Sequence, residues 1–131
     1  MVYRQQMRPS LPLALLLALL LALLLAGCAT TTTLDRVVDG DTLYVRVEGA
    51  VERVRLWAVN APERGQPGAR EATAALRALC TGVDIRLDRV GRDRAGRTVA
   101  RVSCGGQDAG LTLLRAGHAA ADPRYAPAEY R

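Results

Sequence analysis

The feature that most constrains this chain is a run near its N-terminus, Leu11–Ala26, that contains only Leu, Ala and one Pro. Its roughly 16 apolar residues fall short of the ~20 that a helix needs to cross a bilayer. Arg4 and Arg8 precede the run, and a charged start before a short apolar stretch is typical of an export signal. Removing residues 1–27 leaves 104 of the 131 residues, which is enough for one small domain and not for two.

The end of the apolar run distinguishes a cleaved signal from an uncleaved membrane helix. Leu25–Gly27 leads directly into Cys28, and the polar tract Thr30–Thr33 follows shortly after. This pattern resembles the bacterial lipoprotein signal, in which cleavage precedes the Cys and its thiol is lipidated. The resemblance implies a membrane partner through Cys28, since two or more acyl chains anchor a protein stably. We therefore expect an exported protein that is lipid-anchored in a bacterial envelope. Because Ala29 and not Asp follows the Cys, we expect the anchor in the outer membrane, with the protein facing the periplasm.

After a signal peptide at 1–27, we expect a lipidated Cys and Thr-rich linker at 28–33 and one domain at 34–131. The chain has 18 basic residues, all Arg, against 13 acidic ones, which gives a formal charge of +5. This composition excludes an acidic disordered tail, a coiled coil and a multi-span membrane protein. With no Phe, one Trp and four Tyr, the core must consist mainly of Val, Leu, Ile and Ala.

Two cysteines remain once Cys28 is assigned to the lipid. Cys80 ends a helical pattern, and Cys104 ends a strand expected to pair with the one that follows this helix. An even pair in an oxidising compartment predicts a disulfide between them. Two buried free thiols are the alternative.

The alternation of apolar and polar residues predicts five strands and two helices. A loop rich in Pro and Gly is expected at Asn60–Gly68. The expected strands are Leu34–Asp39, Thr42–Val47, Val51–Val59, Val83–Asp88 and Arg97–Ser103, and the expected helices are Glu71–Leu79 and Ala109–Ala116. Three strands, a helix and two further strands suit a closed barrel of the OB type. We therefore predict a mainly β (α+β) fold, a five-stranded OB-fold barrel with two or three helices.

Asp39 and Asp41 flank Gly40 where the first two expected strands turn. Their carboxylate oxygens can converge there, because glycine adds no side chain between them. Hard cations such as Ca²⁺ bind several such oxygens. An ordinary Asp-Gly turn is the alternative.

A second group of polar residues surrounds the end of the third expected strand. Alternation with Leu56 places Arg55 on the outer wall of the barrel, and Asn60, the Ala61 carbonyl and Glu63 follow at the start of the loop. An amide, a carbonyl and a carboxylate at this spacing can complete a metal site and hold a water. A solvated Arg and a loop Glu are the alternative.

A third group is the basic turn that contains Arg92, Arg94 and Arg97. A guanidinium can hold two phosphate oxygens at once, which favours contact with a phosphate. A solvated charged face is the alternative.

Taken in order, these groups resemble the staphylococcal nuclease (thermonuclease) family over Leu34–Pro127. The matching motifs are Asp39-Gly40-Asp41-Thr42, Arg55 with Ala61-Pro62-Glu63, and Asp93 with Gly96-Arg97. The resemblance implies an OB-fold phosphodiesterase that uses Ca²⁺ and cuts DNA and RNA. Single-stranded DNA and RNA would be its partners, and we expect a monomer.

The resemblance also implies roles for single residues. Asp41 would be the main metal carboxylate, with Asn60 and the Ala61 carbonyl as further ligands and Asp39 just outside them. Glu63 would orient or deprotonate the attacking water. The phosphate would be held by Arg55 and Arg97, and other substrate contacts would come from Arg92, Arg94 and Tyr125.

The sequence departs from the family at three places. Asn60 replaces a second metal-binding Asp, so we expect weaker Ca²⁺ binding. Pro123 replaces a pocket tyrosine, and the third helix expected after Ala126 is cut short at Arg131. A noncatalytic module that binds nucleic acid or protein is the main alternative, and a structural lipoprotein of the envelope is another. The presence of Arg55, Glu63 and Arg97 favours the enzyme over both.

Overall fold

The computed structural model describes residues 10–27 and 30–131, so the predicted lipidation site at Cys28 lies outside the described residues. The apolar run forms helix α1 (Leu13–Leu25), in which no side chain is buried. Within these two described ranges, no helix is long and apolar enough to span a membrane.

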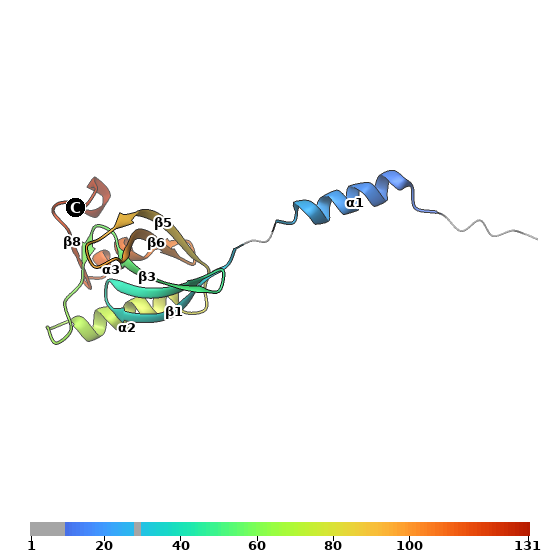
Figure 1. Cartoon of the computed structure of the whole chain (residues 1–131). Helices are drawn as coiled ribbons and strands as arrows, with labels where there is room; N and C mark the ends of the chain where they lie inside the picture. The colour runs from blue at the N-terminus through green and yellow to red at the C-terminus, as the bar shows by residue number, and fades with distance from the viewer. Residues whose placement is uncertain (1–9, 28–29) are drawn as a thin grey trace, which may run out of the picture.

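The rest of the chain forms a curled sheet with two helices packed against it (Figure 1). The strands run in the order β1-β2-β3-β6-β5, and the β3–β6 pair is parallel while its neighbours are antiparallel. Helix α2 lies along β1, and α3 contacts both α2 and β6. The main elements are β1 (Thr32–Asp39), β2 (Thr42–Val47), β3 (Ala50–Leu56), α2 (Ala69–Cys80), β5 (Ile85–Arg92), β6 (Thr98–Cys104) and α3 (Ala109–Arg115). This half-barrel confirms the expected mixed fold of OB type.

The core lies inside the curl of the sheet. Alternating residues of β2 and β3, such as Leu43 and Val54, are fully buried, and Leu76 of α2 packs onto them. Gly40 permits this packing at the turn between β1 and β2. A Cβ at Gly40 would lie 2.6 Å from the Cβ atoms of Ala61, in the loop before α2, and of Ala72, in α2 itself. Only glycine therefore fits between this loop and the helix.

A disulfide joins Cys80, the last residue of α2, to Cys104, the last residue of β6. Their Cα atoms are 5.0 Å apart, and both side chains are buried. The bond fixes the C-terminal end of α2 to the sheet, so it also limits how α2 can move relative to the site at its other end.

The structure shifts several of the sequence-based boundaries, and three of these differences bear on the site or the extent of the domain. β1 begins at Thr32, two residues before the expected start of the domain. The third strand stops at Leu56, because the chain turns through a left-handed Ala58 (φ 65°). β5 continues to Arg92 through an irregularity near Gly91, which shortens the basic turn. Three two-residue strands were not expected: β4 (Val59–Asn60), β7 (Gln107–Asp108) and β8 (Ala120–Ala121).

The C-terminal segment is held against the domain by buried and charged groups. Where a third helix was expected to begin, the chain forms a single 3-10 turn, η1 (Ala128–Tyr130). Tyr130 is buried, and its hydroxyl donates to Asp108, which also caps α3. Arg101 lies over the rings of Tyr130 and Trp57. These contacts hold the segment that carries β8 beside β4.

Candidate active site

Three separate parts of the chain meet at one end of the sheet, around a pocket of about 460 Å³. They are the turn between β1 and β2, the chain from β3 into the loop before α2, and the start of β6. The pocket is lined by Asp39, Asp41, Arg55, Asn60, Ala61, Pro62, Glu63, Arg64 and Arg97. Seven of these nine residues were singled out in the sequence, so the structure brings all three motifs together.

Asp41 is the most buried carboxylate of the pocket, at 9% exposed. Its Oδ2 accepts a hydrogen bond from the Ala61 backbone N–H at 2.8 Å, and its own backbone N–H donates to Asp39 Oδ1 at 3.1 Å. Burial raises the pKa of Asp41, and the neighbouring Asp39 carboxylate adds to the rise, although Ala61 and Arg55 act in the opposite direction. The site therefore holds two carboxylates close together in a partly desolvated position.

Arg55 alternates with the buried Val54 and Leu56, so it faces away from the core as expected, and its side chain lines this pocket. Its Nη2 lies 3.3 Å from Asp41 Oδ2 and donates to Asn60 Oδ1 at 2.7 Å. Its Nη1 donates to the carbonyls of Leu56 and Val59. The turn after Leu56 folds these carbonyls back toward the guanidinium, and this local geometry is what buries the side chain.

Arg97 is held by the turn between β5 and β6. Its Nε donates to Asp93 Oδ2 at 2.6 Å, and its backbone N–H donates to Asp93 Oδ1 at 2.9 Å. Although burial works against it, these hydrogen bonds hold the pKa of Asp93 below its ordinary value. Arg97 Nη1 also lies 3.4 Å from Thr42 Oγ1, which directs the guanidinium toward the Asp41 side of the pocket.

Glu63 lies in the loop between β4 and α2. Its backbone N–H donates to Gln66 Oε1, and the Gln66 N–H donates back to its carbonyl, so a closed turn positions the residue. The side chain is exposed. Within the part of the chain that the structure describes, its carboxylate has no ion-pair partner. It is therefore available to a water or a substrate.

Three of the predicted substrate contacts do not line this pocket. Arg92 donates to the Gly96 carbonyl at 3.4 Å, and Arg94 is exposed in the same turn. Tyr125 is 59% exposed and has the Arg124 guanidinium over its ring. Their roles as substrate contacts stay predictions.

Two residues near the site were missed from the sequence. Arg64 lines the pocket beside Glu63, and its charge next to that residue was a usable signal. Asp122 is buried, and its backbone N–H donates to the Ala58 carbonyl. Its pKa is lowered mainly by the hydrogen bond from Arg124, with a further contribution from the Asn60 side chain. No sequence signal places Asp122 there, because its position depends on the pairing of β4 with β8.

The donor atoms of the pocket fit a hard cation. Asp39 and Asp41 bring carboxylates, Asn60 brings an amide oxygen that here accepts from Arg55, and the Ala61 backbone lines the same pocket; Ca²⁺ prefers carboxylate, amide and carbonyl oxygens. Burial, with a smaller contribution from the Asp39 charge, raises the pKa of Asp41, and a cation bound beside the two carboxylates would favour their charged forms. Among the described residues, no group of three or more His, Cys, Asp or Glu side chains forms a metal site. Such a site would thus depend on the carbonyl and the amide.

Comparison with known proteins agrees with this geometry. Residues 53–131 match the family model described as Staphylococcal nuclease homologue. An uncharacterized endonuclease of Escherichia coli O157:H7 is 34% identical over 85 residues, which cover 64% of this chain and 56% of the relative. The thermonuclease of Staphylococcus intermedius is 36% identical over 94 residues, covering 66% and 56%. An uncharacterized endonuclease of Haemophilus influenzae is 33% identical over 96 residues, covering 72% and 54%.

The chain spans about half the length of the curated relatives it matches. The family match itself covers more than half of the chain and includes the strand with Arg55, the loop with Glu63 and the turn with Arg97. The chain therefore belongs to the staphylococcal nuclease family.

Proposed function

We propose that this protein is a nuclease that hydrolyses phosphodiester bonds of DNA and RNA and depends on Ca²⁺. The observation that carries the proposal is the pocket in which Asp41, Arg55, Glu63 and Arg97 meet, although they come from separate segments. Family membership supports it, and so do relatives that are called endonuclease or thermonuclease.

The two arginines suit the charge that hydrolysis develops on the phosphate oxygens. A guanidinium can donate two parallel hydrogen bonds to a phosphate, and donors fixed in advance favour the transition state over the substrate. Arg55 is fixed by the Leu56 and Val59 carbonyls, and Arg97 is fixed by Asp93. Arg97 is thus held in place before it binds the substrate, whereas Arg55 would exchange its contacts with Asn60 and Asp41 for the phosphate.

Glu63 is the proposed base. Its carboxylate is exposed at the rim of the pocket, so it can orient a water and accept its proton as the water attacks phosphorus. Asp41, Asn60 and the Ala61 carbonyl would hold the Ca²⁺, which supplies positive charge to the phosphate and polarises the water. Asp39 orients Asp41 by accepting its backbone N–H.

The location is also a proposal, and it rests on the sequence. The apolar run and Cys28 favour an exported, lipid-anchored protein in the bacterial envelope, in the outer membrane and facing the periplasm. An oxidising compartment would suit the disulfide between Cys80 and Cys104. Labelling of cells with a radioactive fatty acid tests this point, because Cys28→Ala should abolish the label.

The test of the activity uses the full chain in a non-ionic detergent. Cleavage of single-stranded DNA and RNA is followed with Ca²⁺, with Mg²⁺ and with a chelator. The proposal expects cleavage with Ca²⁺ that the chelator abolishes. A folded protein that binds single-stranded DNA in a salt-sensitive way, yet never cuts it under any of these conditions, would instead be the noncatalytic module.

A further inference from the structure

A second pocket, of about 320 Å³, adjoins the candidate active site. The two pockets share Asp39 and Arg64, so they lie next to each other. From these shared residues the second pocket runs along α2, where Arg70 and Arg77 line it. We call this extension, from Arg64 over Arg70 to Arg77, the α2 groove.

The two arginines of α2 lie on the same outer face of the helix. A spacing of seven residues is two helical turns, and the opposite face carries the buried Ala72 and Leu76. The Thr73 hydroxyl between the arginines donates to the Ala69 carbonyl, so it is not a free donor. The ligand-binding groups of this stretch are therefore the guanidiniums.

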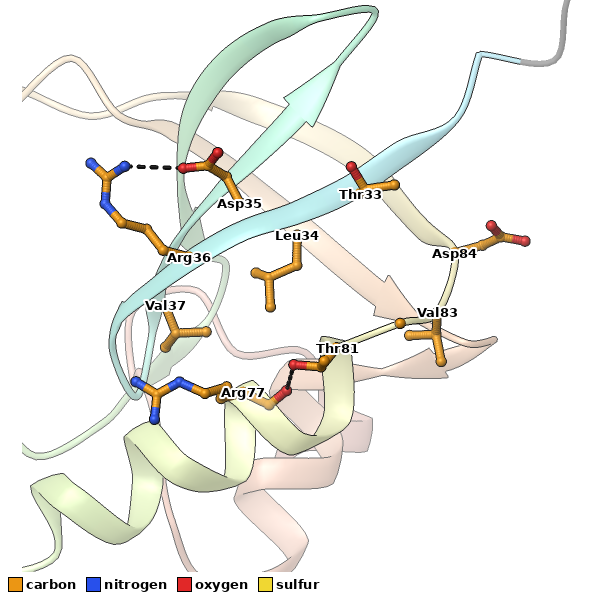
Figure 2. Close-up of a pocket in the computed structure, with 10 residues that line it drawn as sticks. Thr33, Leu34, Asp35, Arg36, Val37, Arg77, Thr81, Val83 and Asp84 are labelled. Carbon is orange, nitrogen blue, oxygen red and sulfur yellow. Dashed lines mark hydrogen bonds and ion pairs between the residues drawn. The ribbon is translucent and has the colours of Figure 1, made fainter.

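Arg77 marks the far end of the α2 groove. It also lines a larger pocket between β1 and the end of α2, where Figure 2 shows its side chain directed toward Val37 and away from Thr81. That larger pocket is lined by the carboxylates of Asp35 and Asp84 as well as by arginines, although Arg77 takes part in none of the ion pairs of the described residues. The excess of positive charge thus stops at Arg77.

The arginines of the α2 groove are not neutralised by the protein. Over the described ranges, Arg64, Arg70 and Arg77 take part in none of the ion pairs. By contrast, Arg36 and Arg46 both pair with Asp35. Of the described residues, Asp39 is the one carboxylate that lines this second pocket, at the end shared with the active site. Three guanidiniums therefore face solvent along one depression.

We propose that the α2 groove binds the sugar-phosphate backbone of the nucleic-acid strand whose scissile phosphate lies in the active site. The inference rests on the proposed function and adds a binding surface to it. Seven helical residues rise about 10 Å, so Arg70 and Arg77 contact separate phosphates of a strand. Such contacts position the strand without reading its sequence. Adjacency to the catalytic pocket, through the shared Asp39 and Arg64, favours this occupant over a membrane surface.

The test compares two double variants that each remove two positive charges. Arg70→Ala with Arg77→Ala removes the α2 pair, and Arg86→Ala with Arg115→Ala removes two exposed arginines outside the groove. Binding of a long single-stranded oligonucleotide to the full chain, in detergent and chelator, is measured at several salt concentrations. Circular dichroism checks that each variant is folded.

The α2 variant should reduce the slope of log K against log salt by about 1.4, since each single-strand phosphate contact contributes about 0.7. Its affinity for the long strand should fall at least severalfold more than that of the control. Cleavage of a dinucleotide, which does not reach the groove, should stay at the wild-type rate in both variants. Arg70→Lys with Arg77→Lys should retain most of the binding, because it keeps the charge.

Equal slopes and affinities in the α2 variant and the control would overturn the inference, while retained dinucleotide cleavage would leave the proposed nuclease standing. Loss of binding to vesicles of anionic phosphatidylglycerol, with oligonucleotide binding unchanged, would overturn it in favour of a lipid surface. A wild-type protein that neither binds nor cuts nucleic acid would overturn the proposed function itself, and the inference with it.

Discussion

Arg55 and Asp41 form an ion pair within the pocket, with 3.3 Å between Nη2 and Oδ2 and only 16% and 13% of their side chains exposed. The pair connects β3 to the turn between β1 and β2. Because Asp41 is also the proposed metal carboxylate, the same contact joins the phosphate-binding side of the site to its cation-binding side. A substitution of either residue should thus affect both phosphate binding and cation binding.

Arg55→Ala should lower kcat by about 10²–10³, the cost of removing a fixed donor to a developing charge. It should also lower the free energy of unfolding by about 2 kcal/mol, because the hydrogen bonds to charged groups around Asp41 are lost. Arg55→Lys should restore little activity, since one ammonium cannot replace contacts to Asp41, Asn60 and two carbonyls. Steady-state kinetics and urea unfolding measure the two effects. Near-normal kcat in Arg55→Ala would contradict its role.

Asn60 lies between two charged groups, because its amide oxygen accepts from Arg55 and its side chain is near enough to Asp122 to help lower the pKa of that carboxyl. Asn60→Asp adds a ligand charge and should tighten Ca²⁺ binding, yet it also places a carboxylate beside that of Asp122. We therefore expect a larger gain, about tenfold or more, when Asp122→Asn accompanies it. Calorimetry with Ca²⁺ measures both variants. No change in either would show that residue 60 is not a ligand.

Glu52 provides a pH-dependent contribution to stability away from the site. Its pKa is lowered chiefly by the hydrogen bond from Arg89, which outweighs the opposing effect of burial, and the hydrogen bond from Thr98 lowers it further. A carboxyl with a lower pKa in the folded state stabilises the fold at neutral pH, and this contribution disappears as the pH falls below the ordinary value of 4.5. Urea unfolding should show that Glu52→Gln is less stable than wild type at pH 7 and that the difference narrows in acid. A difference in the free energy of unfolding that stays the same from pH 7 to acid would contradict the role of the Glu52 carboxylate.

The disulfide between Cys80 and Cys104 closes a loop with a sequence separation of 24 residues. Its removal by Cys80→Ala with Cys104→Ala should cost about 3–4 kcal/mol of the free energy of unfolding in the chain-entropy model. Reduction of the wild type should have a similar effect, whereas the reductant should leave the double variant unchanged. Denaturant unfolding with and without reductant measures the free energy of unfolding of both proteins. Equal stability of the oxidised and reduced wild type would contradict the prediction.

The strands of the sheet and most of the residues that line the pocket could be predicted from the sequence, because both follow from local sequence patterns. Alternation located the strands that bury Leu43 and Val54, and the motif spacing selected seven residues of the pocket. The burial of Arg55 could not be predicted, because it depends on the left-handed turn at Ala58. Asp122 was missed for a related reason. Two-residue strands such as β4 and β8 have no periodicity, and only the folded chain brings them together.

The most direct test of the central claim is the rate of Ca²⁺-dependent cleavage of single-stranded DNA by Glu63→Gln. The matched control is Glu71→Gln, which removes an exposed carboxylate from the first turn of α2, outside the pocket. We predict that Glu63→Gln lowers kcat by about 10²–10⁴ without loss of folding, the usual contribution of a general base, and that Glu71→Gln cleaves like the wild type. Equal rates in all three proteins would contradict the account.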